Sequence, residues 1–484
     1  MSTVSAWTLD GQMAAADDVL AWTAEGESDT QEFKESPSSR DAGLKTLSAM
    51  ANLRGGRVLF GVRDDGTIAG VQIGARTLED LAGAIKAHFQ PELQPDIEVV
   101  EVQPGRHVII VSVIEGRARP YSYRGKSYRR IGRTTTEMTT EEYQRLFLER
   151  HHAAERWETT ASPLTLADLD ADEIVASIDE AVARGRVSDP LSRDPIVILR
   201  QFGLMRTDDL THAATVLFAR PSQLLPYYTQ CLVKLNVFDG TTKDNPVENS
   251  QEHLPAIALI RRGEDFFRTH LPITTTIDPD DLQRKDTPAF PVVVLREALA
   301  NAVAHREYET GSGSISLDIY DDRVEISSIG TLHFGLSVAA LYRPHEAQPW
   351  NPLIAGLLYR RGVVENMGSG TLRMVNACRA VKLLPPIFED DGTSVRVTLM
   401  RPGNLPPQLR ALQLSDLQEQ VLEGLIREPG QSATALAAET AGSRERTVQH
   451  NLRLLSEKGL ARFTGTTKDR KWYPSGQADL EHPG

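Results

Sequence analysis

The most chemically suggestive stretch of the chain is residues 295–308, LREALANAVAHREY. Glu297, Asn301 and His305 follow one another at four-residue steps, which places them on one face of a helix. Apolar residues fill most of the remaining helix surface. Because burying a polar group without a partner is costly, these three side chains must be hydrogen-bonded, hydrated or engaged in binding or catalysis. A carboxylate can polarise water, and an amide oxygen one turn away can bind a hard cation. The stretch therefore predicts either a metal-assisted site or a polar helix that caps a core.

A second group of candidate residues lies in ENMGSGTLRM, residues 365–374. Gly368 and Gly370 would let backbone N–H groups approach a phosphate, because glycine has no side chain to keep a ligand away. The residues that follow would open a helix, whose N-terminus favours anions. A lone Gly-x-Gly is weak evidence, and its position after residues 295–308 is what makes it informative.

These two groups are joined by DDRVEISSIG (321–330) and by the stretch that opens with NPLIAGLLYRRG (351–362). In this order they resemble the GHKL ATPases, the superfamily of gyrase, MutL and histidine kinases. Residues 195–400 are similar to a divergent, RecG-C-terminal-like variant that is common in bacterial proteins described as predicted transcriptional regulators.

The resemblance implies an α/β sandwich that binds ATP and Mg²⁺. Glu297 would be the general base towards water, and Asn301 would hold Mg²⁺. His305 is expected at the pocket margin or in a structural hydrogen bond. Ordinary members read adenine with an Asp-x-Gly-x-Gly motif, but the matching residues 327–335 read SSIGTLHFG and contain no aspartate. Binding with hydrolysis, binding alone and a purely structural fold therefore stay open. The glycines expected to contact the nucleotide are Gly330, Gly368 and Gly370.

The first part of the chain has a resemblance of its own. GESDTQEFKES (26–36), the stretch at 46–71 and RPYSYRGKSYRRIGRTTTEM (119–138) look like the Schlafen-type AlbA-like domain, over residues 25–150. In animal Schlafen proteins this fold cuts structured RNA with two glutamates and one aspartate, and it pairs two lobes where one is visible here. Most bacterial relatives are described as DNA-binding regulators. The matching carboxylates are Glu27, Glu32 and Asp64, with Asp65 as a neighbouring candidate.

Three carboxylates of this kind could hold Mn²⁺ or Mg²⁺ for phosphodiester cleavage. A dimer would have to supply the second lobe of such a nuclease. The alternative is that EFK, residues 32–34, is a structural strand with surface charges.

The stretch from 115 to 133 is strongly basic, whatever family the chain resembles. It contains seven Lys or Arg residues and one acid, with Tyr121, Tyr123 and Tyr128 between them. Basic groups neutralise phosphates and tyrosines can stack on bases, so we expect a nucleic-acid surface here; the alternative is a solvated hairpin. The candidate contacts are Arg124, Lys126, Arg129, Arg130 and Arg133.

The C-terminal stretch 431–474 resembles a winged helix-turn-helix. From 444 to 471 it has eight Lys or Arg residues and three acids, a local excess of five. The second helix of such a fold enters the major groove of DNA while the wing contacts the backbone or minor groove. A protein-interaction module is the alternative. The candidate DNA contacts are Arg444, Arg446, Arg453, Lys468 and Arg470.

Composition limits the remaining possibilities. The chain has 484 residues, 40% of them hydrophobic, and a net charge of −13, so any nucleic-acid surface must be a local patch. Two cysteines, Cys231 and Cys378, argue against a disulfide framework and a Cys-based zinc site. The acidic start does not resemble a signal peptide, and no apolar run is long enough to span a membrane. We therefore expect a cytoplasmic protein.

These elements predict an α+β multidomain chain. The expected parts are an AlbA-like α+β domain at 1–157, a GHKL-like sandwich at 163–401, a Pro-rich linker at 402–414 and a winged helix with a tail at 415–484. In the first part, residues 56–71 read as two strands joined by an Asp-Asp-Gly turn. Helices are expected at 77–89 and 139–157, and strands at 107–116, 125–133 and, as a pair, 314–330.

The predicted function is DNA-binding transcriptional regulation by a homo-oligomer, with ATP and Mg²⁺ as co-ligands. RNA remains possible as the nucleic acid. One alternative is a metal-dependent, Schlafen-like nuclease that cuts structured RNA or DNA in stress or phage defence. Another is a dimeric clamp that hydrolyses ATP.

Overall fold

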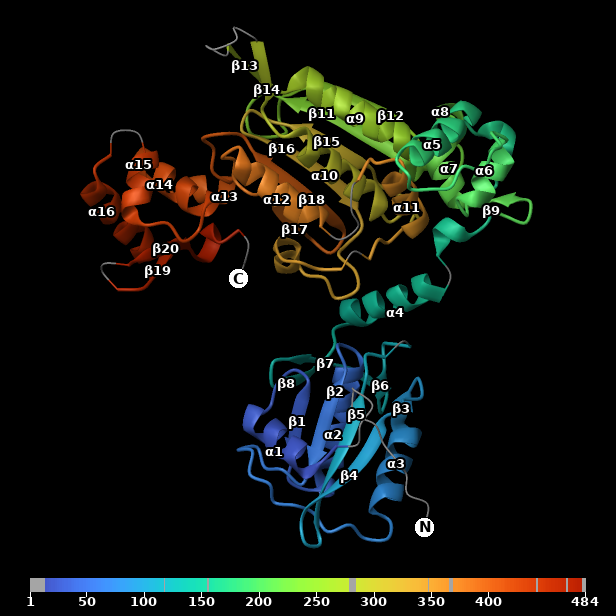
Figure 1. Ribbon diagram of the computed structural model, residues 1–484, viewed down its shortest axis with the longest axis vertical. Coiled ribbons are helices and arrows are strands. Elements are labelled where there is room, and N and C mark those ends of the chain that lie inside the picture. Colours follow the sequence, from blue (N-terminus) through green and yellow to red (C-terminus); the bar gives the residue numbers. More distant parts are fainter. Residues whose placement is uncertain are drawn as a thin grey trace. The chain divides into compact units, whose positions relative to one another are not determined.

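The computed structural model divides into two compact units, residues 1–155 and 156–484, which are described separately (Figure 1). In the described stretches no helix is long and apolar enough to cross a membrane. The structure describes residues 14–116, 118–154, 156–277, 284–346, 348–364, 369–440, 443–466 and 469–480.

The first unit is built on a four-stranded sheet in the order β1-β2-β5-β4, in which β1 and β2 are parallel and the other pairs antiparallel. Both faces are covered, because Val58 and Phe60 of β2 pack towards α2 and α3 while Leu59 packs with Val19 of α1. A continuously apolar strand such as VLF is typical of a strand buried on both faces. The elements are α1 (Ala16–Glu25), β1 (Gln31–Lys34), α2 (Arg40–Ala51), β2 (Gly56–Phe60), α3 (Thr77–His88), β4 (Asp96–Gln103) and β5 (Arg106–Val113).

A smaller sheet in the order β3-β6-β7-β8 completes this unit, and α4 follows it. These elements are β3 (Phe89–Gln90), β6 (Ser122–Tyr123), β7 (Lys126–Ile131), β8 (Thr134–Glu137) and α4 (Thr140–Ala154). The predicted helices α3 and α4 and strands β5 and β7 are confirmed.

The predicted hairpin at residues 56–71 is wrong in its second half. After β2 the chain makes isolated bridges, Val62 with Ile68 and Val71 with His107, in place of a second strand. The reason is that β1 and β5 already pair with the two edges of β2, so no edge is left for a hairpin partner.

The second unit contains a six-stranded sheet in the order β12-β11-β15-β16-β18-β17, with β11 and β15 parallel and the other pairs antiparallel. In β15, Ile315 and Leu317 belong to the apolar core, whereas Ser316 and Asp318 alternate with them. The helices α9, α10 and α12 pack on the apolar face, as expected for a sheet with helices on one side (Figure 1). The strands are β11 (Leu232–Phe238), β12 (Pro246–His253), β15 (Ile315–Ile319), β16 (Arg323–Ile329), β17 (Ile387–Asp390) and β18 (Ser394–Met400).

Further helices and short strands surround this sheet. The helices are α5 (Ala171–Ala183), α6 (Pro195–Gln201), α7 (His212–Phe218), α8 (Pro221–Leu224), α9 (Ala256–His270), α10 (Val292–Ala304), α11 (Pro352–Arg360) and α12 (Gly370–Ala380). The short strands are β9 (Met205–Arg206), β10 (Asp209–Leu210), β13 (Ile273–Ile277) and β14 (Arg284–Pro288).

The unit starts earlier than the sequence suggests. Trp157, placed by the prediction at the end of the first domain, stacks on His212 at 4.3 Å between ring centroids and on Tyr308 at 5.7 Å. Aromatic burial of this kind dominates local packing, so Trp157 belongs to the core of the second unit.

The C-terminal segment packs against the six-stranded sheet. Its helices share one apolar cluster with Leu384, Ile387 of β17 and Met400 of β18. Residues 402–414, predicted to be an open linker, contribute the buried Leu405 and Leu409 to that cluster, so the segment is packed and carries a short helix of its own. The elements are α13 (Pro407–Arg410), α14 (Asp416–Arg427), α15 (Ala433–Glu439), α16 (Glu445–Glu457), β19 (Ala461–Thr464) and β20 (Lys471–Pro474), the last two an antiparallel pair.

Candidate functional site

Helix α10 carries the first candidate site. Glu297 is 4% exposed and Asn301 is half-buried, on the same face of the helix. The helix ends at Ala304, so His305 lies just beyond it, and the His305 N–H donates to the Asn301 carbonyl at 3.0 Å. The Asn351 amide, which sequence reasoning did not single out, donates to the carbonyl oxygens of Ala304 and Arg306 at 3.1 and 2.8 Å and fixes this helix end.

The carboxylate of Glu297 is held by α12. Its Oε2 accepts a hydrogen bond from Nη2 of Arg373 at 2.7 Å. A Cβ on Gly370, the first residue of α12, would lie 2.7 Å from Cδ of Glu297, so any larger residue there would displace the carboxylate from its present position. Gly370, predicted to lie under phosphates, thus lies against a carboxylate at a helix N-terminus, where negative charge is favoured.

Asn301 is the residue that fits a metal ion. Among the residues that the structure describes, no hydrogen-bond partner is found for its side-chain amide, and no group of three His, Cys, Asp or Glu side chains could hold a metal. Mg²⁺ at nucleotide sites often takes only one or two protein oxygens and completes its shell with phosphates and water. A single amide oxygen is therefore a sufficient protein ligand for a nucleotide-bound Mg²⁺.

His305 is not a cation at neutral pH. Burial, with a smaller contribution from His345, lowers the pKa of His305 to about 4. The imidazole is consequently neutral near pH 7 and offers no charge to a phosphate.

Gly330 has a steric role. Its φ is +135°, and a Cβ there would lie 2.9 Å from the His305 carbonyl and 3.4 Å from the Glu307 nitrogen. It lets the end of β16 approach the backbone that follows α10. The prediction that Gly330 contacts the nucleotide stays a prediction, and Gly368 lies outside the described residues.

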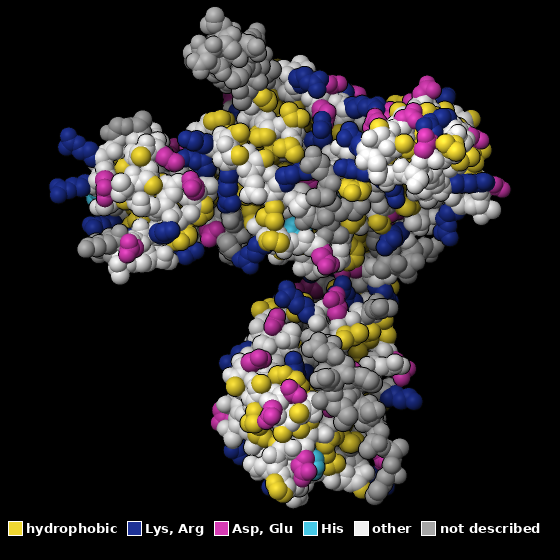
Figure 2. Space-filling model, in the orientation of Figure 1, with side chains coloured by type: hydrophobic (Ala, Val, Ile, Leu, Met, Phe, Trp, Pro, Cys, Tyr) yellow, Lys and Arg dark blue, Asp and Glu magenta, His cyan; other side chains and the backbone are white. Residues whose placement is uncertain are grey.

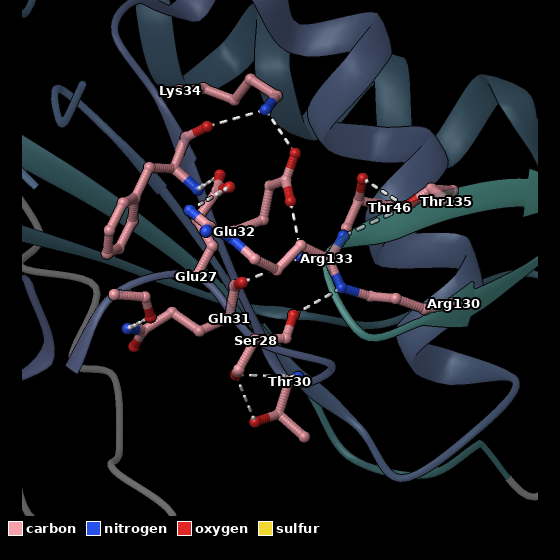
Figure 3. A network of polar contacts seen from close by, with 12 residues as sticks. Glu27, Ser28, Thr30, Gln31, Glu32, Lys34, Thr46, Arg130, Arg133 and Thr135 are labelled. Carbon is pink, nitrogen blue, oxygen red and sulfur yellow. Dashed lines mark hydrogen bonds and ion pairs between the residues drawn. The ribbon is translucent and has the colours of Figure 1, made fainter. Parts of the chain in front are cut away.

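The predicted nuclease carboxylates form a network of ion pairs. Figure 3 shows Glu32 between Lys34 and Arg130, with Nη2 of Arg130 2.7 Å from Oε2 of Glu32. Glu27 accepts from the Phe33 N–H at 3.1 Å and lies 3.6 Å from Nη2 of Arg133.

Asp64 is exposed in the turn after β2 and does not complete a metal cluster with the two glutamates in the described part of the chain. Cations occupy the place that a divalent metal would need. The residues therefore do not fit the expected Mn²⁺ or Mg²⁺ site of a nuclease.

Arg130, predicted to contact nucleic acid, is instead a buried structural residue. Its side chain is 0% exposed. It donates to the carbonyl oxygens of Ser28 at 2.7 Å and Gln31 at 3.0 Å, and to the Thr135 hydroxyl at 3.1 Å, so it joins the loop before β1 to β8 (Figure 3). A guanidinium enclosed in this way presents no surface to a phosphate.

The other cations of the hairpin are exposed but paired with acids. Arg124 lies 2.9 Å from Asp41, Lys126 lies 2.7 Å from Glu137, and Arg129 pairs with Glu142. The tyrosines expected to stack on bases are largely enclosed. Tyr121 and Tyr123 are buried, and the Tyr123 hydroxyl donates to Asp41 at 2.8 Å. All three acids lie outside residues 115–133, so a charge count over that stretch does not include them.

Helix α16 presents cations differently. Val448, Leu452 and Leu455 form its buried face, and Arg446 and Arg453 are exposed on another. Arg444, at the N-cap, is also exposed. Within the described stretches none of these three arginines has an ion-pair partner, and Figure 2 shows Lys and Arg side chains projecting from this part of the unit.

The adjoining hairpin adds aromatic and basic groups. The guanidinium of Arg470 lies 4.1 Å from the ring centroid of Phe463, which is partly exposed, and that of Arg462 lies 5.1 Å from the ring of Tyr473. Lys468, also predicted to contact DNA, lies outside the described residues.

Sequence reasoning missed Arg373 and Glu158. Arg373 could have been found, because a cation one turn into a helix that follows Gly-x-Gly is suited to phosphate. Glu158 could not, since its partners are the N–H groups of Leu353 and Ile354 almost two hundred residues away, at 2.9–3.1 Å.

Comparisons with known proteins agree with two sequence-based expectations. Residues 27–139 match the family model described as "Schlafen, AlbA_2", and residues 312–399 match the one described as "Putative ATP-dependent DNA helicase recG C-terminal". The chain resembles both families. Both predicted resemblances are thus confirmed, one in each unit, although the second match begins after α10.

Solved structures add two distant similarities. The DIP2311 protein from Corynebacterium diphtheriae is 19% identical, with 96% of each chain covered and a TM-score of 0.44. The N-terminal domain of a RecG-related protein from Nitrosomonas europaea is 21% identical and covers 26% of this chain and 95% of its own, with a TM-score of 0.20. A search of curated proteins found no match.

Proposed function

We propose that the protein is a DNA-binding regulator that contacts duplex DNA through α16 and the β19–β20 hairpin and binds a nucleotide between α10 and α12. The proposal of DNA binding rests on a contrast between two basic surfaces. Among the residues that the structure describes, the arginines of α16 are exposed without acidic partners, whereas Arg124, Lys126 and Arg129 of the N-terminal hairpin are each paired.

This contrast matters because phosphate binding by cations gains affinity from counterion release. A paired cation must first give up its carboxylate, which offsets that gain. The unpaired Arg446 and Arg453, seven residues apart on a 13-residue helix, can face one groove while Val448 and Leu452 stay in the core. The expected ligand is therefore duplex DNA, and the hairpin is expected to act as the wing.

Affinity for duplex DNA across a range of salt concentrations tests this half. Arg446→Ala with Arg453→Ala should lower affinity at least tenfold near 0.1 M salt and reduce the slope of log K against log salt by about 2. The matched control is Lys126→Ala with Arg129→Ala, which removes the same charge from the paired surface and should change affinity less. The reverse ranking, with both proteins folded, would assign binding to the N-terminal hairpin.

The nucleotide half is supported by the side chain of Asn301 and by the name of the family model matched at 312–399. Asn301→Ala should abolish Mg²⁺-dependent binding of ATP, because it removes the side-chain oxygen that is proposed to bind the ion. Asn376→Ala, an exposed position on α12, is the control. Calorimetry that shows no heat from the wild type with millimolar ATP and Mg²⁺ would refute this half.

The nuclease and the hydrolysing clamp are less well supported. Glu27 and Glu32 are neutralised internally, and Glu297 is bound by Arg373. A homo-dimer remains part of the proposal, since two copies of α16 could enter successive major grooves.

A further inference from the structure

The ion pair between Glu297 and Arg373 lies where a nucleotide phosphate would compete for it. Arg373 is three residues into α12, and its Nη2 is 2.7 Å from Oε2 of Glu297. The carboxylate is 5% exposed, but the arginine side chain is 27% exposed and can be reached from outside. The anion-binding position formed by the start of α12 and this guanidinium is thus already occupied by the Glu297 carboxylate.

A phosphate group is expected to bind at such a position more tightly than a carboxylate. Arginine binds phosphate through two parallel hydrogen bonds, and a terminal phosphate carries more charge than a carboxylate. A helix N-terminus adds to this preference. Asn301, one turn from Glu297 on the same face of α10, would hold the Mg²⁺ that accompanies the phosphates.

We propose that Arg373 exchanges partners when a nucleotide binds: its guanidinium leaves the Glu297 carboxylate and takes the terminal phosphate. Glu297 is then a built-in competitor that sets the affinity for nucleotides, and Arg373 is a phosphate-binding residue. This inference rests on the proposed nucleotide binding between α10 and α12.

The exchange makes an unusual prediction for Glu297. Glu297→Gln keeps the shape of the side chain but removes the charge that holds Arg373, so it should tighten binding of a non-hydrolysable ATP analogue with Mg²⁺. An effect of about tenfold corresponds to about 1.4 kcal/mol. Arg373→Ala should weaken the same binding tenfold or more, and Arg373→Lys should restore part of it.

A double-mutant cycle on the full chain, measured by calorimetry, isolates the coupling between the two residues. With Arg373 already replaced by alanine, Glu297→Gln should no longer tighten binding, because there is no guanidinium to release. Lys382→Ala, which removes an exposed charge beyond the far end of α12, should change affinity less than twofold. Thermal unfolding of each variant establishes that it is folded.

The outcomes separate the two proposals. Suppose that Asn301→Ala abolishes nucleotide binding. If Glu297→Gln then fails to tighten binding, or tightens it equally when Arg373 is already alanine, the exchange is overturned and the proposed function stays intact. No binding by the wild type or by folded Glu297→Gln would overturn both.

Discussion

At the scale of single residues, Glu158 is the clearest case of a charge placed by the fold. Its side chain is 0% exposed and caps the first turn of α11, where backbone N–H groups lack partners within the helix. Burial raises the pKa of Glu158 to about 7 from its ordinary value near 4.5, although the N–H groups of Leu353 and Ile354 act in the opposite direction.

This shift predicts a pH dependence of stability with a definite sign. Between about pH 4.5 and 7 the folded protein keeps the proton of Glu158 while the unfolded chain releases it, so the free energy of unfolding falls as pH rises. The slope contributed is at most about 1.4 kcal/mol per pH unit, and it vanishes above pH 7. Glu158→Gln keeps the shape and an acceptor oxygen but does not titrate, so it should lose this slope.

Urea unfolding of both proteins at pH 5 and pH 7.5 measures the effect. Other groups titrate equally in the two proteins, and His305 contributes an opposite slope between about pH 4 and 6.5 in both, so only the difference between them is informative. We expect the wild type to lose about 2 kcal/mol more than the variant over this interval. Parallel pH profiles would mean that Glu158 is ionised throughout.

Gly330 gives a second prediction at this scale. Gly330→Ala adds a Cβ 2.9 Å from the His305 carbonyl at a positive φ and should cost about 2–4 kcal/mol of stability. Gly335→Ala is the matched control, because its φ is +73° but no atom lies within 4 Å of the added Cβ. It should cost only about 1 kcal/mol. Equal losses would show that the close approach of β16 to the residues after α10 is unimportant.

Some features of the candidate sites could be predicted from the sequence and others could not. The face shared by Glu297 and Asn301 could be predicted, because helical periodicity is local. The partners of Glu32 and Arg130 could not, since Arg130 meets Ser28 and Gln31 across about one hundred residues. Charge counts along the chain do not show which acids the fold will place beside which cations.

At the scale of elements, the segment at 402–414 is packed against the core and is not an open linker. Its prolines suggested a linker, but Leu409 is 0% exposed within the cluster that α14 and α16 complete. Two leucines four residues apart beside a short helix were a usable sign of packing, which proline content obscured.

Leu409→Ala should therefore destabilise the second unit by about 2–5 kcal/mol, as expected for a large-to-small change in a core. Leu412→Ala, in the same segment but 37% exposed, should cost less than about 1 kcal/mol. The free energy of unfolding from denaturant titration distinguishes them. Two small and equal losses would restore the interpretation of this segment as a linker.

At the scale of the whole molecule, the two units have separate cores. None of the apolar clusters found among the described residues contains residues from both sides of 155. The chain divides after residue 155. The C-terminal helices share an apolar cluster with β17 and β18, which local sequence patterns do not show.

Separate cores predict two calorimetric transitions. Phe60→Ala should lower the transition temperature of the first unit and leave the other unchanged, and Phe266→Ala should do the opposite, since each ring is fully buried in its own cluster. A single transition that moves with either substitution would show that the units unfold together.

The cluster shared by β17, β18 and the C-terminal helices also limits how this architecture can evolve. A different C-terminal segment joined near residue 402 by recombination would meet Ile387 and Met400 with an apolar surface that had not been selected to fit them. For the proposed DNA contact, new specificity is thus more accessible through point substitutions on the outer face of α16, around Arg446 and Arg453, than through the exchange of whole modules. The C-terminal helices and the sheet of this protein are expected to be inherited together.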